Sequence, residues 1–177
     1  MPAPYFKNQK SKKFMMKYSY LSAIVILIVL SHQLARLIIF PAVAAHGSFL
    51  EVTPFFSLVE VWNHGISFGM AKGLPYGQWV LSVTSLTITA IMLYCLHKTE
   101  NKLSISAFSF VVAGALGNVL DRIRFGAVAD YLDFHAFGHH WPAFNFTDVA
   151  IVLGVFLLLF ANIVQSLSAR HGIANRI

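Results

Sequence analysis

LSISAFSFVVAGALGNVLDRIRFGAVAD, residues 103–130, joins a long apolar run to a segment that holds two aspartates and two arginines. The run at 103–120 is long enough to cross a hydrocarbon core of roughly 30 Å, for which a helix needs about 20 mainly apolar residues. The charges therefore lie where the chain leaves the lipid. An ionisable group at membrane depth costs roughly 2.5 to 3.5 kcal/mol on insertion scales, so this segment is a candidate functional site.

The composition of the whole chain indicates a membrane protein. Of its 177 residues, 57% are hydrophobic and 11% are charged, whereas soluble domains carry about 25% charged residues. The mean hydropathy is +0.67. Three further apolar stretches, at 20–43, 78–96 and 149–167, also meet the length requirement. The sequence predicts an all-α polytopic membrane protein with four transmembrane helices, in which residues 1–177 form one domain with no separate soluble part.

Lysine and arginine set the predicted orientation, because short loops rich in them stay in the cytoplasm. Lysines precede the first span and separate the second from the third, and arginines follow the fourth. The outer segments, 44–77 and 123–147, hold few basic residues and several acidic ones. Both termini are therefore expected in the cytoplasm. This asymmetry accounts for the net charge of +6, so no nucleic-acid partner is expected.

The first span could be read as a secretory signal peptide, since a basic leader precedes it and AVA at 42–44 is similar to a cleavage site. The apolar part of a signal peptide is in general only roughly 7 to 15 residues long. The run here is longer, and three more spans follow it. We therefore expect a retained first helix.

The two outer segments contain aromatic and turn-forming residues. Residues 55–62 mix aromatic, β-branched and polar side chains, which predicts a short strand on the membrane surface. Asn63, Gly65 and Gly69 then supply turn chemistry. The segment 123–147 is expected to be a loop whose aromatic residues suit the interfacial depth. The helices are thus expected to carry a small β-containing extracytoplasmic element.

Neither a metal nor an organic cofactor is predicted. Cys95 is the single cysteine, which excludes an intramolecular disulfide and a multi-cysteine metal site, and it is expected to pack in the second helix. His135, His139 and His140 form the cluster HAFGHH, but no HExxH motif accompanies it. A solvated loop is therefore the favoured interpretation of these histidines.

The third span contains small residues that would let a neighbouring backbone approach closely: Ala113, Gly114 and Gly117. Asn118, Asp121 and Arg122 then fall on one side of the helix, at i, i+3 and i+4. Two interpretations of Asp121 and Arg122 are equally open: an interfacial ion pair that caps the span, and a functional site.

Asp130 and Asp148 are the strongest candidates for chemistry. Asp130 lies in GAVADYLDF, whose apolar neighbours predict a loop that folds back against the membrane. Asp148 opens the fourth span, where a helix N-cap is the structural alternative to a catalytic role. If the two carboxyl groups meet, like-charge repulsion would make them share one proton. One could then activate water while the other protonates a leaving amine.

Polar residues also interrupt the first span. His32 and Arg36 lie at i and i+4 on one helix face, which should point into the bundle rather than at lipid. A local packing role and a contact with a substrate are both open for this pair.

Three blocks together resemble the lipoprotein signal peptidase family (signal peptidase II), the aspartic intramembrane proteases of bacteria: GALGNVLDRIRFGAVADYLDF at 114–134, WPAFNFTDVAI at 141–151 and NHGISFG at 63–69. The resemblance implies that Asp130 and Asp148 are the catalytic dyad. It further implies four helices with a small surface sheet, a mobile segment in the first outer loop, and residues that shape or stabilise the site: Asn63, Gly65, Asn118, Arg122 and Asn145.

The chain departs from that family in the first helix. It has HQLAR at 32–36 where the family usually has a DQxxK block, so His32 replaces an acid and Arg36 replaces a lysine at functionally important positions. The change leaves the dyad intact and indicates a divergent or specialised member. Tyr131 in place of the usual Phe is a milder change. If the first pair keeps a positioning role, His32→Asp with Arg36→Lys is expected to retain or raise activity.

The resemblance implies a membrane endopeptidase that removes the signal peptide of diacylglyceryl-modified prolipoproteins just before the lipidated cysteine. Its site would lie near the outer face of the bacterial inner membrane, with membrane lipid around it, and a monomer is expected. Two alternatives remain: a catalytically weak paralogue that binds lipidated peptides, and a small proton-coupled carrier that uses the Asp pair. Broken helices with Gly or Pro at mid-membrane would favour a carrier, but spans two to four lack Pro.

Overall fold

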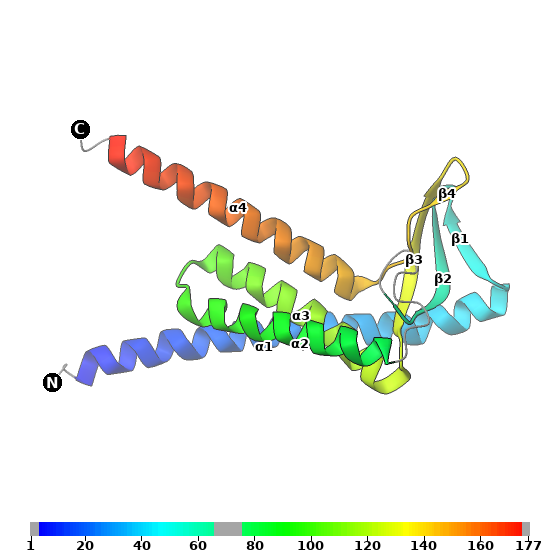
Figure 1. Ribbon diagram of the computed structural model, residues 1–177, viewed down its shortest axis with the longest axis horizontal. Helices are drawn as coiled ribbons and strands as arrows, with labels where there is room; N and C mark the ends of the chain where they lie inside the picture. Colours follow the sequence, from blue (N-terminus) through cyan, green and yellow to red (C-terminus); the bar gives the residue numbers. More distant parts are fainter. Residues whose placement is uncertain (1–3, 66–75, 175–177) are drawn as a thin grey trace.

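The computed structural model describes residues 4–65 and 76–174 (Figure 1). Four helices in these ranges are long and apolar enough to cross a membrane, which confirms the predicted fold class. Each of them contains one predicted span and extends past it at both ends. Their bounds are α1 Pro4–His46, α2 Gly77–Lys98, α3 Lys102–Phe125 and α4 Phe146–Ala174.

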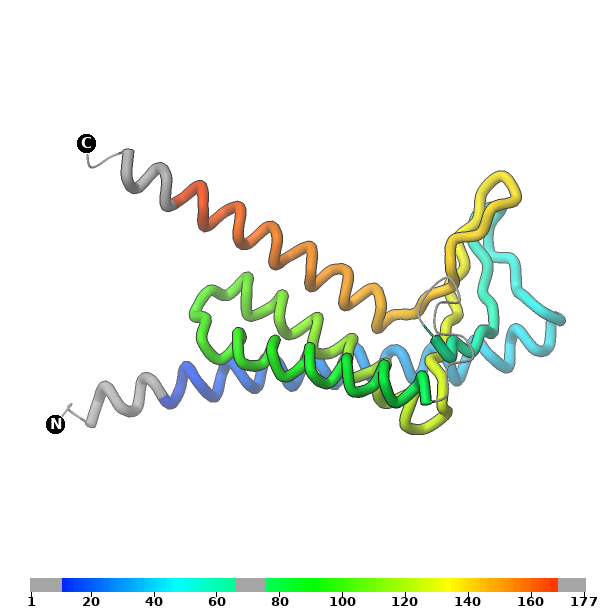
Figure 2. Tube along the Cα trace, viewed as in Figure 1, coloured from blue at the N-terminus to red at the C-terminus, as the bar shows by residue number. Residues whose placement is uncertain are grey.

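The helix α3 is the centre of the bundle. It packs against α1, α2 and α4, and its apolar window is far more buried than those of the other three helices. Figure 2 shows α2 and α3 running side by side along α1. The helix α4 packs along α3 from Thr147, which meets Gly114, to Gln165, whose Nε2 donates to Ser104 Oγ at 3.4 Å. The start of α1 and the end of α4 lie at the same end of the bundle, opposite the β-sheet.

The sheet stands across the bundle end and has four antiparallel strands in the order β1-β2-β3-β4 (Figure 1). Its strands are β1 Phe49–Thr53, β2 Phe56–Asn63, β3 Val128–Ala136 and β4 His139–His140. The strand predicted at 55–62 is confirmed as β2. The prediction of a loop for 123–147 is wrong, because α3 continues to Phe125 and β3 then pairs with β2 along most of its length. This pairing satisfies backbone groups that a loop would leave open.

Close approach of α3 and α4 depends on two glycines, as the small residues predicted. A Cβ on Gly114 would lie against the Thr147 carbonyl and the Ile151 side chain, and one on Gly117 would collide with the Thr147 side chain. The first turn of α4 therefore lies directly on α3. Since Asn118 follows Gly117, this contact brings an α3 side chain to the beginning of α4.

A buried lysine ties α1 to the end of α2. The Lys17 Nζ donates hydrogen bonds to the carbonyls of Leu96, His97 and Thr99, at 3.0, 3.2 and 2.6 Å. These are carbonyls that a helix C-terminus leaves unpaired, and a cation there also complements the helix dipole. Next to this contact, Leu21, Leu96 and Val112 form one apolar cluster of the core.

Cys95 is a free, half-buried thiol on α2, as predicted. Gly69, with most of the outer segment for which a mobile element was implied, lies outside the described residues.

Candidate active site

Asp130 is held at the inner end of β3, where it is 2% exposed. The α3 helix ends at Gly126, whose φ of 74° turns the chain into β3. Asn63 at the end of β2 donates its Nδ2 to Asp130 Oδ2 at 3.0 Å, and Asn145 donates its Nδ2 to Asp130 Oδ1 at 2.6 Å. Burial, followed by the charge of Asp148, raises the pKa of Asp130 to about 7, against the effect of the two amide donors. Asp130 is therefore a carboxyl group that can hold a proton near neutral pH.

Asp148 lies in the first turn of α4, but it is not the N-cap that the sequence allowed. The cap is Asn145, whose Oδ1 accepts the backbone N–H groups of Thr147 and Asp148 at 2.8 and 3.1 Å. Asp148 Oδ2 in turn accepts the backbone N–H of Asn145 at 3.2 Å. This reciprocal arrangement is a capping box, with Asp148 at its third helical position. The other carboxylate oxygen of Asp148 accepts Asn118 Nδ2 at 2.9 Å.

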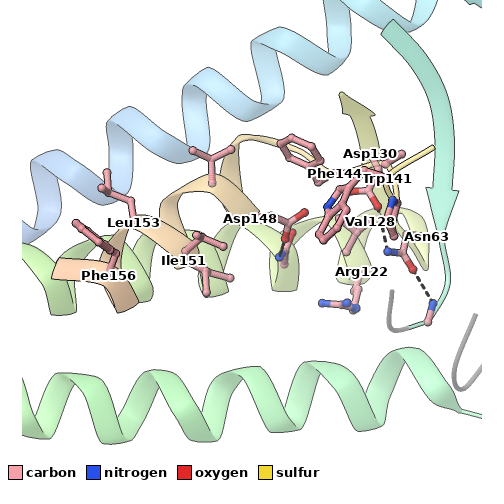
Figure 3. Close-up of a pocket in the computed structure, with 16 residues that line it drawn as sticks. Asn63, Arg122, Val128, Asp130, Trp141, Phe144, Asp148, Ile151, Leu153 and Phe156 are labelled. Atoms are coloured by element: carbon pink, nitrogen blue, oxygen red, sulfur yellow. Dashed lines mark hydrogen bonds between the residues drawn. The ribbon is translucent and has the colours of Figure 1, made fainter. Parts of the chain in front are cut away.

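Asp130 and Asp148 line the same cavity, of about 830 Å³, near the junction of α3, α4 and the sheet (Figure 3). They come from different elements, and Asn145 is bonded to both of them. The cavity has a polar end, formed by Asn63, Gly65, Asn118, Arg122, Asp130 and Asp148. Its other walls are mainly apolar and include Val149, Ile151, Val152, Leu153 and Phe156 of α4. Such a site can hold an apolar molecule along the walls and place one polar bond of that molecule next to Asp130 and Asp148.

Asp121 and Arg122 point to different sides of α3. The prediction that they lie on one side of the helix with Asn118 is therefore wrong, and so is the interpretation of the two as an ion pair. Asp121 has zero exposure and faces α1, where it accepts His32 Nε2 at 2.9 Å and Gln33 Nε2 at 2.6 Å. Arg122 lines the cavity, and its Nε is buried without a hydrogen-bond partner. The reason is helical geometry, because adjacent residues point about 100° apart. Arg122 supplies positive charge in the cavity that Asp130 and Asp148 line. Asp121 holds α1 against α3 through its bonds to His32 and Gln33.

His32 and Arg36 both lie on the bundle side of α1, as predicted, but the cavity lining contains neither of them. His32 is fully buried between Asp121 and Tyr131. The Arg36 guanidinium lies 4.5 Å from the centre of the Phe125 ring, and its Nε is buried without a partner. Six of the ten candidate residues line the cavity, and Asn145 is bonded to both of its carboxyl groups. Asp121, His32 and Arg36 lie outside the cavity lining.

Two residues of the site were missed by the sequence reasoning. Thr147 is fully buried, and its Oγ1 lies 2.6 Å from Asn118 Oδ1 and 2.5 Å from Asn145 Oδ1. Tyr131 is also fully buried, and its hydroxyl contacts both His32 and the first backbone N–H of α4. Their positions beside Asp148 and Asp130 in the sequence were the available signal. An inward direction of these side chains could not be read from it.

The histidines at 135–140 lie in the β3–β4 hairpin, where His139 and His140 are exposed. His135 Nε2 lies 3.1 Å from Ser57 Oγ, and His140 Nδ1 lies 2.8 Å from Asp133 Oδ2. Within residues 4–65 and 76–174, no group of three or more His, Cys, Asp or Glu side chains could hold a metal ion.

A family model described as "Signal peptidase (SPase) II" matches residues 24–164. A lipoprotein signal peptidase from Anaplasma phagocytophilum is 41% identical over 145 residues, covering 81% of this chain and 92% of the relative. Another from Paraburkholderia phymatum is 35% identical over 150 residues, covering 83% and 89%. A solved structure described as a bacterial membrane enzyme has a TM-score of 0.70 and 27% identity, and it covers 84% of this chain and 90% of that one.

Proposed function

Because this chain belongs to the signal peptidase II family, we propose that it cleaves prolipoproteins with an aspartic mechanism in which Asp130 and Asp148 are the catalytic residues. The family makes it a peptidase of the bacterial inner membrane that acts on prolipoproteins. The observation that supports the dyad is the shared cavity, where Asn145 bonds both carboxyl groups. Residues 1–177 act as a single domain in this proposal.

The dyad performs two proton transfers. One carboxylate takes a proton from a water molecule, whose oxygen attacks the carbonyl carbon of the scissile peptide bond. The other, protonated, carboxyl group donates its proton, and the leaving amine departs as the C–N bond breaks. Because burial and the charge of Asp148 raise the pKa of Asp130 to about 7, the two carboxyl groups hold one shared proton near neutral pH.

The surrounding polar groups position these carboxyl groups. Asn63 and Asn145 fix the two oxygens of Asp130, while Asn118 fixes one oxygen of Asp148. Arg122 is the cation of the cavity lining, and with its Nε unpaired it is available to the oxyanion of the tetrahedral intermediate. Preorganised donors at developing charge stabilise a transition state more than they stabilise the substrate.

The substrate is the signal peptide of a prolipoprotein with a diacylglyceryl-modified cysteine, cut just before that cysteine. The apolar residues of α4 in the cavity wall suit an apolar segment that enters from the lipid. In this proposal both termini are cytoplasmic, and the sheet end with the active site lies at the outer face, where water is available. The protein acts as a monomer.

The test is cleavage by the purified full chain in detergent. One substrate is a prolipoprotein peptide with a diacylglyceryl cysteine, and the matched control is the same peptide without the lipid. Mass spectrometry should find a single cut before the cysteine in the lipidated peptide only. Binding without cleavage would support the weak paralogue instead, and proton flux in liposomes without cleavage would support the carrier.

A further inference from the structure

A buried histidine and a buried tyrosine next to the dyad carry a hydrogen-bond chain that the proposed reaction does not use. His32 of α1 and Tyr131 of β3 both have zero exposure. Their rings stack with centres 5.7 Å apart, and His32 Nδ1 lies 3.2 Å from the Tyr131 hydroxyl. The same hydroxyl accepts the backbone N–H of Phe146, the first residue of α4, at 3.2 Å. One phenol thus joins α1 to the strand and the helix that carry the two aspartates.

The direction of each hydrogen bond follows from Asp121. This carboxylate accepts the N–H groups of Gln33 and Ala129, at 2.6 and 3.0 Å, in addition to His32 Nε2 at 2.9 Å. An ionised carboxylate only accepts hydrogen bonds, so His32 Nε2 carries a hydrogen. In a neutral ring the other nitrogen, Nδ1, is then an acceptor. The acceptor at Nδ1 requires a donor, which is the hydroxyl of Tyr131.

The resulting chain satisfies every buried atom in it. Phe146 N–H donates to the Tyr131 hydroxyl, the hydroxyl donates to His32 Nδ1, and His32 Nε2–H donates to Asp121. Burial raises the pKa of the Tyr131 phenol above its usual range, so the hydroxyl keeps the proton that it donates. If the His32 ring carried two hydrogens, the Tyr131 O–H would have no acceptor among the described residues, and an unmatched buried donor is costly.

We propose that Tyr131 and His32 are positioning residues that act as one unit to hold β3 and the first turn of α4, and hence Asp130 and Asp148, at their catalytic separation. Tyr131 follows Asp130 directly, and Phe146 precedes Asp148 by two residues, so the phenol acts within two residues of both carboxyl groups. Neither His32 nor Tyr131 lines the cavity. Their effect should therefore fall on turnover and leave substrate binding unchanged. This inference rests on the proposed function of the dyad.

The kinetic test uses variants that break one bond each. Tyr131→Phe removes only the hydroxyl. His32→Gln keeps an amide near the position of Nε2 for Asp121 but offers nothing at Nδ1. Each should lower kcat by about tenfold with KM unchanged, and the double variant should be no slower than either single one, because residues that act as a unit are non-additive. Ser57→Ala is the matched control, because it deletes another hydroxyl-to-histidine bond of the same sheet, one that is part-buried and lies away from the cavity lining. It should keep wild-type kcat.

A spectroscopic readout works without turnover. In wild-type protein labelled with ¹⁵N-histidine, His32 should show a hydrogen-bearing Nε2 and an unprotonated Nδ1. The Nδ1 signal should move toward that of a free pyridine-type nitrogen in Tyr131→Phe and stay in place in Ser57→Ala. Wild-type kcat in both Tyr131→Phe and His32→Gln, additive losses, or an unmoved Nδ1 signal would each overturn the proposal. A wild-type chain that cleaves no lipidated peptide but gives the expected ¹⁵N signals would refute only the proposed function.

Discussion

Asn145 and Asp148 cap the start of α4 reciprocally: the Asn145 side-chain oxygen accepts the Asp148 N–H at 3.1 Å, and Asp148 Oδ2 accepts the Asn145 N–H at 3.2 Å. Because the oxygen of Asn145 is occupied in this way, its Nδ2 is directed to Asp130, at 2.6 Å. A structural device at a helix end thus also sets the position of one proposed catalytic carboxyl group relative to the other. Capping and catalysis are not alternatives at this site.

Asparagine substitutions of the dyad should abolish turnover and leave folding intact. Asp130→Asn and Asp148→Asn keep an oxygen acceptor but remove the group that transfers protons. Each should remove nearly all cleavage of a lipidated peptide and still fold in detergent, with a lowered unfolding temperature, because the new NH2 group faces one donor that the carboxylate accepted. The double variant should be little slower than either single one. If Asp148→Asn keeps most of its activity, the dyad is wrong, and Asp121 or Asp133 becomes the next candidate.

Asn145→Ser should separate capping from catalysis. Serine caps a helix about as well as asparagine, but it has no amide to reach Asp130. We expect a loss of kcat of at least about tenfold, since a hydrogen bond to a charged group contributes roughly 1.5 to 3 kcal/mol, and a lowered thermal stability from the same lost bond. Asn145→Ala is the comparison: it also loses the cap, so it should be about 1 kcal/mol less stable than Asn145→Ser at a similar kcat. Wild-type kcat in Asn145→Ser would contradict the role given to this amide.

The pH dependence of cleavage should report the shared proton. The pKa of Asp130 is raised to about 7 by burial and by Asp148. Above this pH the pair loses the proton that the leaving amine needs, so kcat/KM should fall with an apparent pKa near 7 that belongs to the pair. A profile of kcat/KM that stays flat through neutral pH would exclude a shared proton on the Asp130–Asp148 pair.

The same shift sets the sign of a stability effect. The folded-state pKa of Asp130 is raised from 3.8 to about 7, so between these values the folded protein binds more protons than the unfolded chain. Its contribution to stability is fully present below about pH 4 and is lost as the pH rises to 7. The unfolding temperature in detergent should therefore fall as the pH rises across this range, and it should fall less steeply in Asp130→Asn than in wild type.

Restoring the family's usual residues in the first helix should damage this chain. The sequence alone led us to expect that His32→Asp with Arg36→Lys would retain or raise activity. The contacts of His32 lead to the opposite expectation, because an aspartate there would place a second carboxylate against the fully buried Asp121, where His32 Nε2 now donates a hydrogen bond. Like charges brought together in a buried site are strongly destabilising. The double variant should unfold at lower temperature, whereas Arg36→Lys alone should be mild; wild-type stability of the double variant would contradict this.

The proposed orientation can be tested by thiol labelling. In a Cys95→Ser background, cysteines are placed singly at His139 in the outer hairpin and at Thr99 between α2 and α3. A membrane-impermeant reagent added from the periplasmic side should modify the first and not the second. The reverse pattern would overturn the orientation and, with it, the access of water to the active site.

Much of the membrane architecture could be predicted from the sequence. Hydrocarbon thickness sets a length for each span, so the four apolar runs were sufficient to find four helices. The strand at 55–62 followed from its mixture of residue types, and the close contact of α3 with α4 followed from Gly114 and Gly117. The two aspartate-bearing blocks were also sufficient to single out Asp130 and Asp148.

What the sequence by itself determined were properties that depend on local composition and spacing: spans, charge asymmetry and the motifs that carry the candidate carboxyl groups. Only the tertiary structure decided which side chains face each other. It turned Asp121 away from Arg122 toward His32, made Asn145 the cap of α4, and converted the segment after α3 into a strand. The physical reason is that hydrogen bonds between distant elements select a side chain's direction, whereas periodicity along one element fixes only its approximate face.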